Sequence, residues 1–247
     1  MKGGEVLSHY FEMTSLERDI KDDKSFATKA DTESERAIVS VIEKAFPDHG
    51  FLGEEGTDIR PDAEYRWVID PLDGTNNFVN GIPLFAISIA ATVNGVPVIS
   101  VVYNPITRSL YAAEKGKGAT YNGKPVRVSD QKPEMGIITF GPGSKVKDLL
   151  NELMSGTERA SFKSKRYLGA TALELGYVAR GGTEAYVCLG LKKWDYAAGV
   201  LLIQEAGGTV TDFSGGEWNL DIPFFIASNG VAHQAALALV KPFLDRI

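Results

Sequence analysis

Residues 67–78 read WVIDPLDGTNNF, and this stretch places an apolar strand directly before two acids. The strand ends in Asp70, and Pro71 then interrupts pairing with a neighbouring strand. Asp73 and a glycine follow, and ligands in α/β folds gather where strands end in such turns. If a helix begins near Thr75, its first amides point outward as an anion site. Carboxylates beside an anion need cations between them, so oxygen-only ligands here favour Mg²⁺ over Zn²⁺.

Each acidic segment also has a simpler interpretation. Asp, Pro and Gly are common turn residues, so residues 70–74 and Gly53-Glu54-Glu55-Gly56 can be surface turns. Asp195 opens an otherwise apolar stretch, which alone is typical of a helix N-cap. The three segments therefore indicate a functional site only when they are considered together.

The residues around this stretch predict a sheet with two helices before it. Asn94-Gly95 is a strong hairpin signal and indicates an antiparallel meander. Asp31 or Thr32 is expected to cap the second helix, with Glu35 in a capping box. A charged loop is expected over 17–29. The predicted helices are 3–12 and 31–46, and the predicted strands are 51–53, 66–70, 86–93, 96–103, 109–114 and 119–121.

After a polar stretch at 129–135 the pattern changes, because strands and helices then alternate. Such alternation predicts a sheet covered by helices. We therefore expect a mixed fold, α+β in residues 1–131 and α/β in residues 132–247. The predicted strands here are 136–140, 162–167, 184–187, 209–212 and 224–227, and the predicted helices are 145–155, 170–180, 195–206 and 231–243.

Composition excludes several functional classes. The chain has 247 residues and a formal net charge of -6, which argues against a nucleic-acid binder and a membrane-surface protein. One cysteine cannot form an internal disulfide, and no apolar run approaches the roughly 18 residues of a membrane span. The start lacks an apolar signal region, so we expect a cytoplasmic protein. The three histidines lack zinc-site spacing, and no P-loop is present.

Taken in order, the acidic segments resemble the inositol monophosphatase family, within the superfamily of metal-dependent, lithium-sensitive sugar phosphatases. The resemblance covers nearly the whole chain and implies a layered αβαβα sandwich. The matching segments are Thr28-Lys29-Ala30-Asp31, Gly53-Glu54-Glu55, residues 70–75, residues 115–119, Trp194-Asp195-Tyr196-Ala197-Ala198-Gly199 and residues 204–208.

This resemblance implies two or three Mg²⁺ ions, with Mn²⁺ as an alternative. Glu54, Asp70 and the backbone carbonyl of Leu72 would bind the first ion, and Asp70, Asp73 and Asp195 the second. Without metal, four carboxylates packed together would repel one another and take up protons.

The resemblance also implies the catalytic groups. Glu54, together with Thr75 paired to Asp31, would activate the water that attacks phosphorus in line, and no phosphoenzyme would form. Asp31 also suits a helix N-cap, and both roles stay open. The amides of Gly74, Thr75 and Asn76 would hold phosphate oxygens.

Substrate contacts are less defined by the sequence. A family turn that contacts the sugar matches Gly169-Ala170-Thr171. Cys188 stands where the inositol phosphatases have an acid, and a thiol is a weak acceptor, so strict inositol specificity is in doubt. Cys188 equally suits a small buried apolar position. Arg166 and Lys193 suit either a pocket for a second phosphate or a solvated strand edge and loop.

We therefore expect a phosphoric monoester hydrolase that acts on a small sugar or polyol phosphate, either inositol 1-phosphate, fructose 1,6-bisphosphate or both. A 3'-phosphoadenosine 5'-phosphate phosphatase and a partner-binding regulator on the same fold are the alternatives. The family also implies a homodimer and a first helix longer than the one predicted here.

Overall fold

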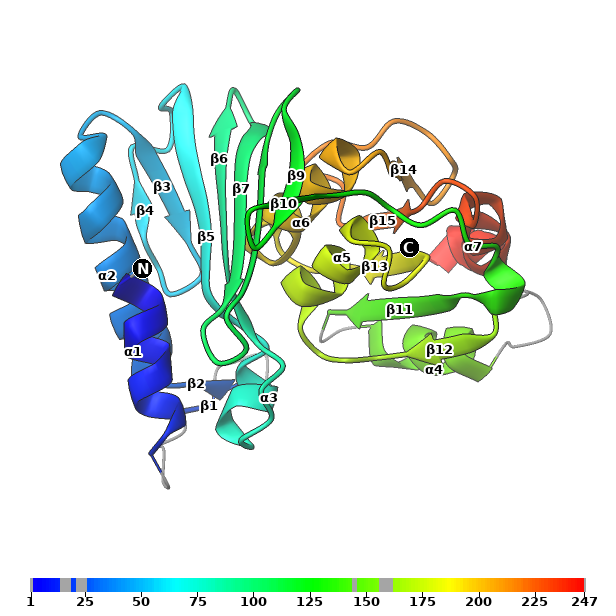
Figure 1. Ribbon diagram of the computed structural model, residues 1–247, viewed down its shortest axis with the longest axis horizontal. Coiled ribbons are helices and arrows are strands. Elements are labelled where there is room, and N and C mark those ends of the chain that lie inside the picture. The colour runs from blue at the N-terminus through cyan, green and yellow to red at the C-terminus, as the bar shows by residue number, and fades with distance from the viewer. Residues whose placement is uncertain (1, 14–18, 21–25, 144–145, 156–161, 247) are drawn as a thin grey trace.

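The structure, a computed structural model, describes residues 2–13, 19–20, 26–143, 146–155 and 162–246. The chain forms five layers in the order helix, sheet, helix, sheet, helix (Figure 1), which confirms the expected αβαβα sandwich. The helices are α1 (Lys2–Phe11), α2 (Lys29–Ala45), α3 (Thr75–Val79), α4 (Lys147–Ser155), α5 (Thr171–Ala179), α6 (Lys193–Glu205) and α7 (His233–Val240), with 3-10 turns at Pro133–Met135 and Lys241–Arg246.

The first sheet has eight strands in the order β10-β9-β8-β7-β6-β5-β3-β4. Strands β5 to β10 pair antiparallel in sequence order, which confirms the predicted meander. Asn94 and Gly95 form its first hairpin turn with φ of 49° and 79°, as this pair favours. The strands are β3 (Gly50–Gly53), β4 (Asp58–Ile59), β5 (Tyr65–Asp73), β6 (Ala86–Val93), β7 (Val96–Asn104), β8 (Ser109–Glu114), β9 (Gly118–Tyr121) and β10 (Lys124–Val126).

The second sheet has five strands in the order β12-β11-β13-β15-β14. Strand β11 runs parallel to β12 and β13, whereas β15 runs antiparallel to β13 and β14. The strands are β11 (Ile137–Pro142), β12 (Ser164–Arg166), β13 (Ala185–Leu189), β14 (Thr209–Asp212) and β15 (Phe224–Ser228); a separate two-stranded sheet pairs β1 (Asp19–Ile20) with β2 (Phe26–Ala27).

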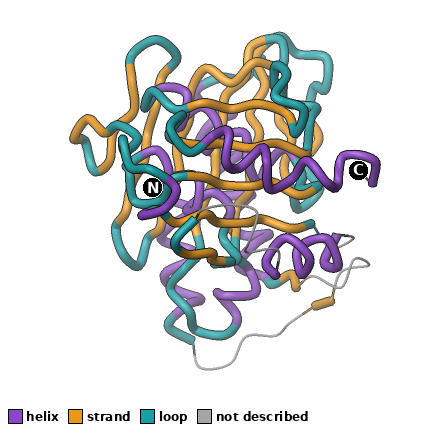
Figure 2. Tube along the Cα trace, turned by 90° about the vertical axis from the view of Figure 1, so that its right-hand side faces the viewer, coloured by secondary structure: helices purple, strands orange, loops and turns teal. Residues whose placement is uncertain are grey.

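Three apolar cores join the layers. Helices α1 and α2 cover one face of the first sheet, α5 and α6 fill the space between the sheets, and α4 and α7 cover the outer face of the second sheet (Figures 1 and 2). Residues Tyr196–Ile203 of α6 are all buried, as expected for a helix between two sheets. Burying each large apolar side chain contributes about 1.5–3 kcal/mol.

Most predicted elements are present, and strands 86–93, 109–114 and 209–212 have the predicted bounds. The predicted cap of α2 is wrong: Thr28 is the N-cap, and Asp31 stands at the third helical position, where it closes the capping box in place of Glu35. The predicted loop over 17–29 contains the short strands β1 and β2, although residues 17–18 and 21–25 lie outside the described residues.

The two sheets lie on either side of residue 131, within residues 50–126 and 137–228. The central core draws on both, for example on Val68 and Phe225, so a division into two domains at this point stays a prediction. No helix in the described part of the chain is long and apolar enough to cross a membrane.

Candidate functional site

Asp31 and Thr75, the predicted catalytic pair, are joined by a hydrogen bond. Asp31 lies in the first turn of α2 and is fully buried, and Thr75 opens α3. The Thr75 hydroxyl lies 3.2 Å from Asp31 Oδ1 and 3.0 Å from the carbonyl oxygen of Leu72, so two acceptors compete for one proton. Burial raises the pKa of Asp31 to about 6, against two hydrogen bonds from Thr28 that lower it. The pair therefore holds a carboxyl that titrates close to neutral pH.

Asp70 lies where β5 leaves regular pairing with β6, since the register shifts between Asp70 and Asp73. Asp70 is 1% exposed and accepts a hydrogen bond from the Leu72 amide at 2.9 Å. Burial raises its pKa well above the ordinary range, and the charges of Glu54, Asp73 and Asp195 raise it further. The four carboxyl groups predicted to bind metal are therefore near enough to repel one another.

Asp73 connects the first sheet to the central helices. Its Oδ1 accepts from the Thr171 amide at 3.1 Å and its Oδ2 from the Ala172 amide at 2.7 Å. These first amides of α5 have no carbonyl partner within the helix, and the helix dipole favours a negative charge there. Burial, with the charge of Asp195, nevertheless raises the pKa of Asp73. Asp73 thus also caps the start of α5, a role that the sequence did not predict.

Glu174 holds the two amides just before these. Its Oε1 accepts from the Gly169 amide at 3.1 Å and from the Ala170 amide at 3.4 Å. The side chain is fully buried, which raises its pKa to about 8. Among the described residues, Oε2 and the Thr139 hydroxyl form no hydrogen bond of ordinary geometry. The hydroxyl is nevertheless near enough to lower the pKa of Glu174 in part. Together, Asp73 and Glu174 take up the amides of four consecutive residues in the turn predicted to contact substrate.

Glu54 lies in a loop that Glu35 anchors. Glu35 is 3% exposed; its Oε2 accepts from the Glu55 amide at 2.9 Å, and its Oε1 accepts from the amide and hydroxyl of Thr57 at 3.2 and 2.6 Å. A Cβ on Gly53 would lie 2.4 Å from this carboxylate, so the close approach requires glycine. The sequence pattern predicted that Glu35 caps the helix. The signal for its actual role is that an acid stands on the buried face of an amphipathic helix.

The turn at Gly74 packs directly against the turn at Gly169. Gly74 has φ of 90°, and a Cβ there would lie 2.9 Å from the Leu84 carbonyl oxygen and 3.2 Å from that of Gly169. The side-chain amide of Asn77 also donates to the carbonyls of Leu168 and Gly169, at 2.8 and 3.3 Å. The two turns expected to hold phosphate and sugar therefore form one unit.

Asp195 lies at the third position of α6, and its Oδ2 accepts from the Lys192 amide at 2.7 Å. Lys192, not Asp195, is the N-cap residue, so the N-cap interpretation is wrong for Asp195 as for Asp31. The predicted site residues differ in access to solvent. Asp31, Asp70, Leu72, Asp73, Ala170, Thr171 and Cys188 are buried; Glu54, Gly74, Thr75, Gly169, Lys193 and Asp195 are half-buried; Asn76 and Arg166 are exposed.

Three predicted substrate contacts have partners within the protein. Cys188 is fully buried in the central core, which agrees with the apolar interpretation and leaves its thiol without solvent access. Arg166 donates to the carbonyl of Lys165 at 2.8 Å, and Lys193 forms an ion pair with Asp221. The pocket for a second phosphate therefore stays a prediction.

The donor set fits a hard divalent cation, because it consists of carboxylate and carbonyl oxygens that repel one another when no cation is present. Within the described ranges, however, no three His, Cys, Asp or Glu side chains already stand together as a metal cage. Asp70, Asp73 and Asp195 instead accept hydrogen bonds from backbone amides. A cation would therefore have to draw these oxygens together.

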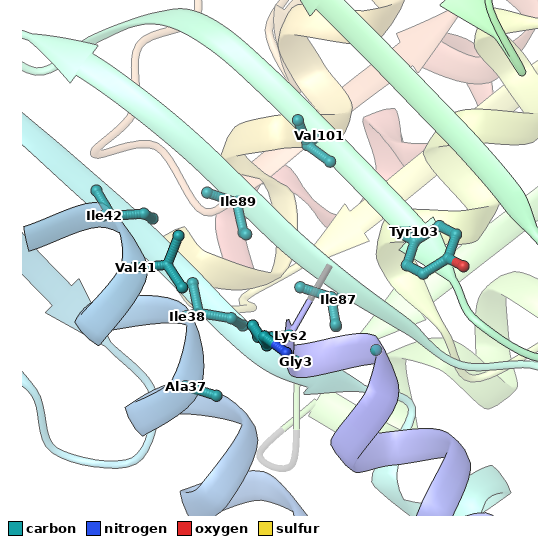
Figure 3. Close-up of a pocket in the computed structure, with 11 residues that line it drawn as sticks. Lys2, Gly3, Ala37, Ile38, Val41, Ile42, Ile87, Ile89, Val101 and Tyr103 are labelled. Carbon is teal, nitrogen blue, oxygen red and sulfur yellow. The ribbon is translucent and has the colours of Figure 1, made fainter. Parts of the chain in front are cut away.

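A separate apolar pocket of about 210 Å³ lies between α1, α2 and strands β6 and β7 (Figure 3). None of the predicted site residues lines it, and it offers no set of donors for a phosphate. Its lining residues are Lys2, Gly3, Gly4, Ala37, Ile38, Val41, Ile42, Ile87, Ile89, Val101 and Tyr103.

Comparisons with known proteins agree with this arrangement. The sequence profile of the inositol monophosphatase family matches residues 1–243. The chain is 41% identical over 249 residues to an inositol-1-monophosphatase of Mesorhizobium japonicum, covering 98% of this chain and 92% of that protein. It is 40% identical over 235 residues to the Nus factor SuhB of Pseudomonas aeruginosa, covering 91% and 86%.

A third relative is a fructose-1,6-bisphosphatase/inositol-1-monophosphatase of Thermotoga maritima, 38% identical over 224 residues, with 91% of this chain and 86% of that protein covered. Among solved structures, a Thermotoga maritima IMPase superposes with a TM-score of 0.89 and 36% identity, covering 99% of this chain and 94% of that one. Both the sequence and the layered fold are thus shared over nearly their full length.

Proposed function

The chain belongs to the inositol monophosphatase family, a family of metal-dependent phosphoric monoester hydrolases, and on that premise we propose that it removes phosphate from inositol 1-phosphate, fructose 1,6-bisphosphate or both. Relatives named for each of these activities are about 40% identical to it. The observation that carries the proposal is the set of mutually repelling carboxyl groups beside the hydrogen-bonded pair of Asp31 and Thr75.

The ion in this proposal is Mg²⁺, with Mn²⁺ as an alternative. Glu54, Asp70 and the Leu72 carbonyl would hold one ion, and Asp70, Asp73 and Asp195 a second, with a weaker third ion near Glu54. Bound Mg²⁺ would offset the carboxylate charge, polarise the phosphate and lower the pKa of a bound water.

The proton of the attacking water would pass to groups of this chain. In this proposal the Thr75 hydroxyl donates to Asp31 rather than to the Leu72 carbonyl. The lone pairs of the Thr75 oxygen can then accept a hydrogen bond from a water. Glu54 lies on the opposite loop and would share this task. Because Asp31 has a pKa near 6, it is mostly ionised at neutral pH and able to orient Thr75.

The phosphate and the organic group would bind at the two packed turns. The amides of Gly74, Thr75 and Asn76 lie at the first turn of α3, where amides lack intrahelical partners. The turn at 169–171 would contact the sugar or polyol. Arg166 and Lys193 are the cations proposed to bind a second phosphate, which requires Lys193 to leave Asp221.

The direct test is phosphate release with Mg²⁺ from inositol 1-phosphate, fructose 1,6-bisphosphate and 3'-phosphoadenosine 5'-phosphate, each with an EDTA control. Metal-dependent release from either of the first two supports the proposal. Release from the nucleotide alone would favour the alternative substrate, and release that persists in EDTA would contradict the metal mechanism.

Asp73→Asn tests the metal ligands, since it removes a charge and keeps the side chain's shape. It also makes an NH₂ group face one of the α5 amides, so its stability is measured beside its activity. We expect turnover to fall below detection while the variant stays folded by circular dichroism. Activity close to that of the unchanged protein would contradict a metal role for Asp73.

A partner-binding role is the second candidate, because a relative that is 40% identical is named a Nus factor. It becomes the better explanation if the chain releases no phosphate from any of the three substrates. The homodimer expected from the family is tested by light scattering of the purified protein.

A further inference from the structure

Tyr167 is a large aromatic side chain that the fold leaves open to solvent beside the candidate site. It lies between β12 and the turn at Gly169, and it is 54% exposed. Tyr111, Tyr186 and Tyr196 are, by contrast, almost fully buried. Single exposed hydrophobic side chains are common on protein surfaces. What distinguishes Tyr167 is that its ring is open to a ligand next to the candidate site.

The ring stands over the turn expected to contact substrate. A Cβ on Gly169 would lie 3.9 Å from Cζ of Tyr167, the ring carbon that carries the hydroxyl. The Gly169 carbonyl is in turn 3.2 Å from the Cβ position of Gly74. The phenol therefore neighbours the turn at 169, which in turn packs against the turn at 74.

The charges of the site also reach the phenol. Burial on one side raises the pKa of Tyr167, and Glu174 and Asp73 would raise it further wherever they are ionised. The hydroxyl is therefore uncharged near neutral pH, and it can donate or accept a hydrogen bond.

The backbone that carries Tyr167 is held in place. The Leu168 and Gly169 carbonyls accept from Asn77, and the Gly169 amide donates to Glu174. Because the neighbouring backbone is already ordered, a ligand that contacts Tyr167 would restrict mainly the rotation of its side chain.

We propose that Tyr167 is a specificity-determining residue whose ring packs against the carbon skeleton of a cyclic sugar or polyol phosphate and whose hydroxyl meets one of its hydroxyl groups. The inference rests on the proposed function and narrows its substrate class to phosphates whose organic part is a five- or six-membered ring. Tyrosine suits such a position because it has an apolar body and a polar tip. A small acyclic phosphate ester would bind through its phosphate and leave the ring uncontacted.

The test compares two substrates, the better of inositol 1-phosphate and fructose 1,6-bisphosphate, and glycerol 2-phosphate. The proteins are the unchanged chain, Tyr167→Ala, Tyr167→Phe and the control Tyr65→Ala. Tyr65 is similarly exposed, at 46%, and begins β5 at the end opposite to Asp73.

We expect Tyr167→Ala to lower kcat/KM for the cyclic substrate about tenfold, mainly through KM, because one lost apolar contact has an effect of about this size. The value for glycerol 2-phosphate and inhibition by inorganic phosphate should change less than about twofold. Tyr167→Phe keeps the ring and removes the hydroxyl, so its kcat/KM for the cyclic substrate should lie between those of Tyr167→Ala and the unchanged protein. Tyr65→Ala should match the unchanged protein.

An equal fall for both substrates, no change for either, or a changed oligomeric state in Tyr167→Ala would overturn the inference. These outcomes are distinct from failure of the proposed function, in which the unchanged chain itself would release no phosphate from either cyclic substrate.

Discussion

Two loops of the candidate site, residues 53–57 and 169–172, are each anchored by a buried glutamate, and the two glutamates are satisfied differently. Glu35 accepts three hydrogen bonds, and both of its oxygens are used. Glu174 accepts two of ordinary geometry, both through Oε1, and its buried Oε2 has only the nearby Thr139 hydroxyl, which forms no such bond. The first loop is thus held by a fully bonded carboxylate, and the second by a carboxyl that favours its protonated form.

The difference matches the tasks proposed for the two loops. The loop at 53–57 carries Glu54, whose oxygens must be placed within tenths of an ångström to bind a cation. The turn at 169–172 would contact the organic part of the substrate, where apolar contacts tolerate more variation. Because burial raises the pKa of Glu174 to about 8, this anchor adds little negative charge beside Asp73 at pH 7.

Glu35→Ala should have the largest effect, because it leaves three donors in the first loop without an acceptor. At about 1–3 kcal/mol for each buried donor, and allowing for water to reach some of them, we expect a loss of about 3 kcal/mol in the free energy of unfolding. Glu54 would also lose its position, so phosphatase activity should fall at least about a hundredfold. Urea unfolding and steady-state kinetics measure the two effects.

Glu43→Ala is the matched control, since Glu43 lies on the same helix and forms an exposed ion pair with Arg60 at 3.6 Å. Such a pair contributes at most about 1 kcal/mol. A Glu35→Ala protein no less stable than Glu43→Ala would show that the loop does not depend on its carboxylate anchor.

Local sequence patterns predicted some features of the site and of the fold. The acids at 54, 70, 73 and 195 follow strand ends or open a helix, which are local signals, and their order resembles one family. Their role as metal ligands stays a prediction. Hairpins were also predicted from local signals, as at Asn94-Gly95, where the turn chemistry sits in two adjacent residues.

Glu35 and Glu174 were missed because their role depends on burial: the partners of Glu174 lie only four and five residues before it. Asp73 and Asn77 have distant partners. Asp73 reaches amides 98 and 99 residues away, and Asn77 reaches a carbonyl 91 residues away. No pattern within one element encodes such a contact. The caps of α2 and α6 were assigned to the acids for a related reason: an acid at the third helical position and one at the N-cap look alike until the helix start is known.

Replacing each glutamate by glutamine should lower the free energy of unfolding by different amounts, and this difference should be smaller than the effect of Glu35→Ala. In Glu35→Gln the new NH₂ group must face an N–H or O–H donor, so we expect a loss of about 2 kcal/mol in stability. In Glu174→Gln the NH₂ group can replace Oε2 and donate to the Thr139 hydroxyl, so the loss should stay below about 1 kcal/mol. Urea unfolding at pH 7 measures both, and equal losses would contradict the difference drawn between the anchors.

The smallest expected effect is a difference in how stability depends on pH. The pKa of Glu174 is raised from 4.5 to about 8 in the folded chain, so the folded state binds more protons than the unfolded state between these values. Stability should therefore fall as pH rises through this window, by up to about 1.4 kcal/mol per pH unit from this group. Asp31, Asp70 and Asp73 also have raised pKa values and add slopes of the same sign.

The three aspartates are present in all variants. The contribution of Glu174 is therefore the difference between the unchanged chain and Glu174→Gln in how steeply the free energy of unfolding changes with pH. In EDTA, between pH 6 and pH 8, the free energy of unfolding of Glu174→Gln should fall less steeply than that of the unchanged chain, by about 1 kcal/mol per pH unit. Glu35→Gln should keep the slope of the unchanged chain, since it leaves Glu174 in place. If Glu174→Gln keeps that slope as well, Glu174 is ionised throughout, and the two anchors differ in the number of their hydrogen bonds but not in charge.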